Sequence, residues 1–192
     1  MTQNKIEMIL PLMKALHNDD FSTIDKLLSQ GADVNLPYNH HGWTPFMWVC
    51  KEHTDPEIIK MFIDHGGDVN SKNKYGVTPL HIVAKHRSNS DIAELLIDAG
   101  ANPDAQDNHG WTALMKAVSH PQAPMRKVLI RNLAENSDTS IKNNEGKTAY
   151  DLAKENAAFD DERLMLFLKP VDDLTEDEFH KIFVTFMGGD NE

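Results

Sequence analysis

The amino-acid sequence predicts an all-α solenoid built from stacked helix–turn–helix repeats. Two observations carry this prediction. A turn containing glycine and threonine recurs with its glycines 34, 34 and 36 residues apart, at Gly42, Gly76, Gly110 and Gly146. A second glycine-centred motif alternates with it at the same period. Recurrence at this spacing is typical of repeat proteins, whose single units cannot bury their apolar face alone and therefore stack.

The first motif places a turn directly before a helix. It occupies residues 41–46, 75–80, 109–114 and 145–150, and reads His-Gly-Trp-Thr-Pro-Phe, Tyr-Gly-Val-Thr-Pro-Leu, His-Gly-Trp-Thr-Ala-Leu and Glu-Gly-Lys-Thr-Ala-Tyr. Glycine permits a turn that other residues resist. The threonine caps the helix, and proline in two copies occupies the first turn, where its missing N–H costs nothing.

The second motif ends a second helix, at residues 31–35, 66–70 and 100–104. That helix begins at a cap of its own, for example Asp55 or Ser90, and Gly66 or Gly100 ends it in a left-handed conformation. Together the motifs resemble the ankyrin-repeat family, whose repeat of about 33 residues carries the Thr-Pro-Leu-His signature found intact at residues 78–81. The resemblance covers residues 5–169, as repeats at about 5–38, 39–72, 73–106, 107–142 and 143–169.

Both ends and the fourth repeat depart from this pattern. The first repeat lacks the glycine–threonine turn and begins directly with a helix, as a capping repeat does. The fourth has Leu133 in place of the helix-ending glycine. We therefore expect one extra helical turn over 133–135, with Asn136 as its C-cap.

An acidic tail over residues 170–192 contains a predicted amphipathic helix at 175–187. Thr175 and Glu178 form a capping box at its start. Its apolar face is expected to cover the last repeat, and docking to a partner is the alternative. That face consists of Phe179, Ile182, Phe183 and Phe186.

The composition argues against several classes of ligand and against an oxidising compartment. The formal net charge of −11 argues against nucleic acid and anionic membranes as partners. Cys50 is the single cysteine, so no intramolecular disulfide forms and a reducing compartment is expected. Since no signal peptide and no run of roughly 18 apolar residues is present, we expect a cytoplasmic protein, monomeric when free.

The sequence contains no recognisable catalytic or cofactor-binding motif. The sequence has no phosphate-binding glycine-rich loop, no nucleophile elbow and no Cys-x-x-Cys pair, so we expect no catalytic residue and no cofactor. The ten histidines are expected to be surface or contact residues, with no metal site among them. For His81 the family resemblance implies an internal hydrogen bond. Cys50 is expected to be a small buried hydrophobe.

The family resemblance implies a protein-binding module that uses its concave surface of finger-like turns and first helices. In this family the residue after the turn glycine projects toward that surface, and here it is Trp43, Val77, Trp111 and Lys147 in turn. Because tryptophan is enriched at interface hot spots, we predict that Trp43 and Trp111 anchor a partner protein. The alternative is that each indole lies flat on the next turn and stiffens the array. Nearby lysines favour an acidic or mixed patch on the partner. The expected binding residues are His41, Trp43, Lys51, Tyr75, Val77, Lys85, His86, His109 and Trp111.

Several functions remain open at this point. A binding module serves as an adaptor or as an inhibitor, including an immunity-type protein that blocks the active site of a toxin or enzyme. An enzyme with an unrecognised site and a structural subunit of a larger assembly are the other classes.

Overall fold

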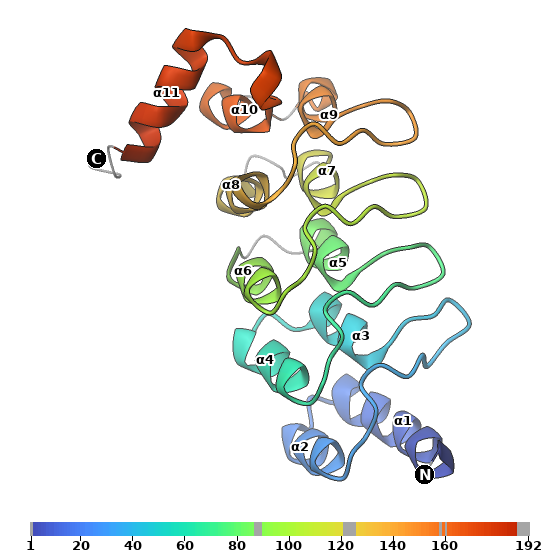
Figure 1. The fold of residues 1–192 in the computed structure, drawn as a ribbon. Coiled ribbons are helices and arrows are strands. Elements are labelled where there is room, and N and C mark those ends of the chain that lie inside the picture. The colour runs from blue at the N-terminus through green and yellow to red at the C-terminus, as the bar shows by residue number, and fades with distance from the viewer. Residues whose placement is uncertain (1, 87–89, 121–125, 158, 160, 188–192) are drawn as a thin grey trace. The chain divides into compact units, whose positions relative to one another are not determined.

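The computed structural model describes residues 2–86, 90–120, 126–157, 159 and 161–187, and the side chains within these ranges from residue 7 to residue 182. These parts of the chain contain eleven α-helices and no strand, which confirms the all-α prediction (Figure 1). The chain falls into two compact units, Met1–Asn102 (unit 1) and Pro103–Glu192 (unit 2), and each is described by itself.

Unit 1 consists of three helix pairs. They are α1 (Thr2–His17) with α2 (Phe21–Ser29), α3 (Pro45–Glu52) with α4 (Pro56–Asp64), and α5 (Pro79–His86) with α6 (Ser90–Asp98). The first helices α1, α3 and α5 pack in one row, and α4 packs on α6 in the other. Fully buried side chains from both rows form the core, among them Leu16, Phe46, Phe62, Ile92 and Leu96.

Unit 2 contains two further pairs and the tail. These are α7 (Ala113–Val118) with α8 (Lys127–Asn136), then α9 (Ala149–Glu155) with α10 (Glu162–Leu168). The 3-10 helix η2 (Val171–Asp173) leads into α11 (Glu176–Met187). Helix α7 packs on α8 and α9, and α10 packs on α8, α9 and α11.

The helices begin and end where the sequence motifs predict. The side-chain oxygens of Thr44, Thr112 and Thr148 each accept an N–H from the first turn of α3, α7 and α9, at 3.1, 3.3 and 3.2 Å. At the other end of the second helices, Gly66 and Gly100 adopt φ of 84° and 90°, the left-handed conformation that glycine tolerates best. These three threonine caps, the Asp55 cap of α4 and the two helix-ending glycines are confirmed. Ser90, predicted as a cap, is instead the first residue of α6.

The fourth repeat contains the expected extra turn, with one correction. Helix α8 continues to Asn136 and buries Leu133 completely. Asn136 is the last helical residue, however, and Ser137 is the C-cap. Ser137 has an extended backbone, and its hydroxyl donates to the carbonyl of Leu133 at 2.7 Å. This hydrogen bond satisfies a terminal carbonyl, so the helix ends without a left-handed residue.

One side chain at the end of each second-motif copy bridges to the following repeat. The amide nitrogens of Asn35 and Asn70 donate to the carbonyl of the next helix-ending glycine at 2.7 and 2.8 Å. Their oxygens accept the N–H two residues beyond that glycine at 2.9 and 2.8 Å. In unit 2, Asp104 occupies the equivalent position and accepts the N–H of Asp138 at 2.7 Å.

The tail helix has the predicted capping box. Glu178 accepts the N–H of Thr175 at 2.9 Å, and the Thr175 hydroxyl accepts the N–H of Glu178 at 3.3 Å. Phe179, expected to lie under cover of the last repeat, is instead 55% exposed. Contact between α11 and α10 therefore leaves this part of the apolar face in solvent. The side chains of Phe183 and Phe186 lie outside the described residues.

Candidate protein-binding surface

The two finger-like turns of unit 1, residues 38–44 and 72–78, are shaped by an asparagine in each. The Asn39 side-chain oxygen accepts the N–H groups of His41 and Trp43 at 3.0 and 3.1 Å. Asn73 does the same for the second finger, at 2.9 and 3.1 Å. The N–H of Lys74 also donates to the carbonyl of His41 at 3.0 Å, which ties the two turns together. Fixed backbone of this kind holds the fingertip side chains in defined positions.

An aromatic group lies at these two fingertips. The ring of His41 lies 3.8 Å from that of His40 and 5.7 Å from that of Tyr75. The Tyr75 hydroxyl and Nδ1 of His41 also share a hydrogen bond of 2.7 Å. Tyr75 remains 50% exposed, so the group presents an aromatic edge to solvent. We call His40, His41 and Tyr75 the fingertip cluster.

The other expected binding residues of unit 1 lie on the same fingers or at the ends of the first helices. Trp43 and Val77, which follow the turn glycines, are half-buried. Lys51 is half-buried near the end of α3 and pairs with Glu52 at 2.5 Å. Lys85 and His86 are exposed at the end of α5. Fingers and first-helix ends of unit 1 together form what we call the finger surface.

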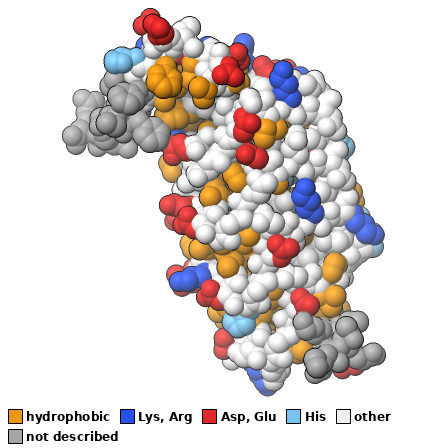
Figure 2. All heavy atoms as spheres, in the orientation of Figure 1, with side chains coloured by type: hydrophobic (Ala, Val, Ile, Leu, Met, Phe, Trp, Pro, Cys, Tyr) orange, Lys and Arg blue, Asp and Glu red, His pale blue; other side chains and the backbone are white. Residues whose placement is uncertain are grey.

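The charge of the finger-surface segments is opposite to that of the remaining unit. Residues 36–53 and 70–86 contain four lysines (Lys51, Lys72, Lys74 and Lys85) and one acid, Glu52. The remaining residues of unit 1 contain twelve acids and five lysines or arginines. Figure 2 shows lysine and histidine side chains on the finger side, and acidic side chains together with some basic ones on the side of α4 and α6.

In unit 2, a lysine ties Trp111 to its own repeat. The Lys116 ammonium lies 4.6 Å from the centre of a Trp111 ring and 2.8 Å from an Asp107 carboxylate oxygen. The other Asp107 oxygen accepts the N–H groups of His109 and Trp111 at 2.9 and 3.0 Å. Burial raises the pKa of Asp107, but the hydrogen bonds from Lys116 and the backbone outweigh it, so the pKa lies below its ordinary value. These contacts join Trp111 to the first helix of its own repeat, rather than to the next turn as the alternative interpretation expected.

The ion pair between Asp107 and Lys116 could have been predicted by comparing equivalent positions of the four fingers, although the two glycine motifs do not include these residues. Position 107 holds the one acid among four equivalent finger positions, the others being Asn39, Asn73 and Asn143. Lys116 likewise follows nine residues later, where the other repeats have uncharged residues. An acid and a lysine that replace neutral residues in the same repeat indicate a pair.

Family models for ankyrin repeats match most of the chain. One, with three repeat copies, covers residues 12–107, and a second covers residues 96–153. The chain belongs to the ankyrin-repeat family. It is also similar to the human 2-5A-dependent ribonuclease, with 33% identity over 57 residues. That match spans 30% of this chain and 8% of the ribonuclease.

The ankyrin signature residues have the role that the family resemblance implied. In residues 78–81, the Thr78 hydroxyl and Nδ1 of His81 share a buried hydrogen bond of 2.7 Å. His81 is therefore a structural residue inside the repeat. Cys50, in the preceding first helix, is fully buried, as expected for a small hydrophobe.

The described residues contain neither a metal-binding cluster nor a helix that could span a membrane. Within these ranges no three histidine, cysteine or acidic side chains come together as a metal site would require. Nor does any described helix combine the length and apolar character needed to cross a membrane.

The ankyrin repeats place the predicted binding residues in two groups. His41, Trp43, Lys51, Tyr75, Val77, Lys85 and His86 belong to unit 1, and His109 and Trp111 belong to unit 2. His41 and Tyr75 are brought into direct contact. Ankyrin repeats are protein-binding modules, and the finger surface of unit 1 is the candidate site.

Proposed function

We propose that this ankyrin chain binds a partner protein through the finger surface of unit 1, and that the partner presents an acidic patch there. The observation that carries the proposal is the local reversal of charge. A chain with a formal net charge of −11 places four lysines and one acid in the segments that form this surface. Complementary charge raises the rate of encounter and selects between partners.

The fingertip cluster supplies the contact area for the same proposal. Tyr75 offers a half-exposed ring whose position is fixed by His41 and by the finger backbone. Tyrosine and tryptophan dominate interface hot spots because they bury a large area with few rotatable bonds. We assign Tyr75 and Trp43 the role of anchors and Lys74 and Lys85 the role of electrostatic selection. Trp111, held by Lys116, serves its own repeat in this proposal.

The proposal covers an adaptor and an inhibitor, including an immunity-type inhibitor of a toxin or enzyme. An inhibitor of this kind would cover an active site rich in carboxylates, because the finger surface is basic. We propose that the protein is not an enzyme and that it acts as a monomer in the cytoplasm. Membership in the ankyrin family supports the binding role, and the buried free thiol of Cys50 fits a reducing compartment.

The experiment begins by isolating the partner from the source cell with the full chain as bait, followed by mass spectrometry. Binding of the purified partner is then measured by calorimetry for Tyr75→Ala, Trp43→Ala and Lys85→Glu. We expect each to weaken binding about tenfold or more, in line with hot-spot losses of roughly 2 kcal/mol. The melting temperature of each variant is recorded in parallel.

Two matched controls accompany these variants. Lys60→Glu reverses an exposed charge of the same unit on α4, outside the finger segments, and should leave affinity unchanged. Trp111→Ala should lower the melting temperature more than the affinity. If Tyr75→Ala and Lys85→Glu bind as tightly as the parent chain, the site has been misplaced.

A further inference from the structure

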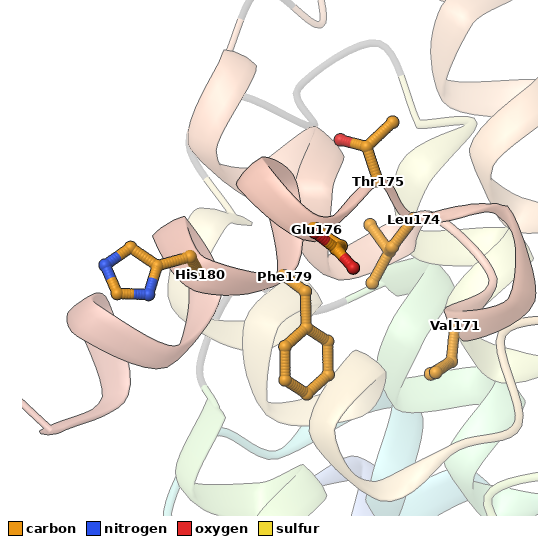
Figure 3. Close-up of a pocket in the computed structure, with 6 residues that line it drawn as sticks. All are labelled: Val171, Leu174, Thr175, Glu176, Phe179 and His180. Atoms are coloured by element: carbon orange, nitrogen blue, oxygen red, sulfur yellow. The ribbon is translucent and has the colours of Figure 1, made fainter.

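A pocket of about 540 Å³ opens in unit 2, between η2 and the first turns of α11 (Figure 3). The side chains of Val171, Leu174 and Phe179 point toward the same opening, with the Glu176 carboxylate beside them. We call this site the tail pocket. Its lining consists of Val171, Leu174, Thr175, Glu176, Phe179 and His180.

The apolar walls of the tail pocket are unusually exposed. Val171 is 70% exposed and Phe179 is 55% exposed, while Leu174 between them is half-buried. Two large apolar side chains that face one opening are a feature of surfaces that bind another molecule. The capping box at Thr175 and the ion pair of Glu178 with Lys169, at 2.8 Å, fix the start of α11. The Lys169 ammonium and the Thr175 N–H lower the pKa of Glu178 to about 2.

The rim of the pocket is acidic. Asp172, Asp173, Glu176 and Asp177 are all exposed within two turns of chain around the apolar walls. Lys181 is the single lysine or arginine between residues 170 and 182. A ligand that places positive charge around an apolar contact is therefore complementary to this site.

The same charges argue against two other occupants. A second copy that docked through the same pocket, as in a symmetric dimer, would bring the four acids of one rim against the four acids of the other. The chain's own last residues, 188–192, contain Asp190 and Glu192 and no basic residue, so they meet the same repulsion.

We propose that the tail pocket binds a basic, amphipathic segment of a partner protein. An apolar side chain of that segment enters between Val171 and Phe179, and its lysines or arginines face the acidic rim, as in recognition of an amphipathic helix by a groove. The charge preference is opposite to that of the finger surface. The inference does not rest on the function proposed for unit 1, since none of its residues belongs to that surface.

The test uses the full chain and a fluorescently labelled amphipathic peptide of leucine and lysine, with binding followed by anisotropy. Phe179→Ala should weaken binding about tenfold, and Val171→Ser provides a second, independent variant of the wall. Val128→Ala is the matched control, because Val128 is 67% exposed on α8 of the same unit and lies outside the pocket. Affinity should also fall as salt is raised, because the rim charges are exposed.

Reversing the charges distinguishes the proposed recognition from non-specific hydrophobic binding. A peptide of leucine and glutamate should not bind the parent chain, whereas Asp172→Lys combined with Glu176→Lys should reject the lysine peptide and accept the glutamate peptide. Equal binding by the parent chain and by both wall variants would overturn the proposal, as would equal binding of the two peptides. A dimer seen by sedimentation velocity that Phe179→Ala dissociates would also overturn it, because the occupant would then be a second copy.

Discussion

The ion pair between Asp107 and Lys116 gives a quantitative test of how the fourth repeat is held. Asp107→Asn keeps an oxygen that accepts the N–H groups of His109 and Trp111 but removes the charge facing Lys116. The Asp107 side chain is 3% exposed and that of Lys116 is 22% exposed, so water screens this pair less than a surface pair. Because the variant keeps part of the network, we expect a loss of about 1–2 kcal/mol in the free energy of unfolding, toward the lower end of the roughly 1.5–3 kcal/mol of a full hydrogen bond to a charged group.

The pH dependence of this loss has a definite sign. Burial raises the pKa of Asp107, but the hydrogen bonds from Lys116, Trp111 and His109 together hold it below its ordinary value in the folded chain. The stabilisation is therefore complete above the unfolded-state pKa of about 3.9, and it is lost as pH falls through the folded value. The parent chain and Asp107→Asn should differ by the same free energy at pH 7 and pH 5, and should converge below about pH 4.

Urea denaturation followed by circular dichroism at pH 7, 5 and 3 measures this difference. Asn73→Asp is the matched control, because it creates an acid in the equivalent finger position of unit 1, where Ile82 takes the place of the lysine. It should destabilise the chain at pH 7 and do so less at pH 3. Equal unfolding free energies for the parent and Asp107→Asn at pH 7, or a difference that persists undiminished at pH 3, would refute this account.

Two further predictions concern a finger and the tail. Gly110 and Gly146 have similar φ, 75° and 77°, but a Cβ at Gly110 would meet the backbone nitrogen of Asn144 at 2.8 Å, whereas one at Gly146 meets nothing within 4 Å. Gly110→Ala should therefore lower the melting temperature more than Gly146→Ala, whose strain alone costs about 1 kcal/mol; equal losses would contradict the steric argument. Deleting residues 172–192 should lower the melting temperature by a few degrees, because α11 packs on α10 and Glu178 pairs with Lys169. An unchanged value would mean that the tail adds nothing to the folded unit.

Features set by local chemistry could be predicted from the sequence. Each of these features depends on residues within one turn of each other: the threonine caps, the left-handed Gly66 and Gly100, the capping box at Thr175 and the longer helix at Leu133. The stacking of repeats could then be predicted from the regular spacing of the two motifs, since a single repeat cannot bury its own apolar face.

Features that depend on contacts between distant residues could not be predicted in the same way. Helical spacing shows which face of 175–187 is apolar, but it does not show what lies against that face, and Phe179 proved to be exposed. The two finger tryptophans occupy equivalent sequence positions, yet the lysine that covers Trp111 comes from the following helix. The hydrogen bond between His41 and Tyr75 joins two repeats, which neither motif reveals alone.

The bridges between successive repeats define which segments can be exchanged. Asn70 donates to a carbonyl that a left-handed glycine exposes, so it needs a following helix that ends in glycine. The Asp104 carboxylate can only accept hydrogen bonds, and α8, the second helix of the next repeat, has Ser137 as its C-cap and no glycine there. The type of bridging residue thus matches how the next helix ends. A transplanted helix pair would therefore have to carry with it the last motif residue of the repeat before it. The interchangeable module thus begins at Asn70 or Asp104, three residues before the repeats that start at 73 and 107.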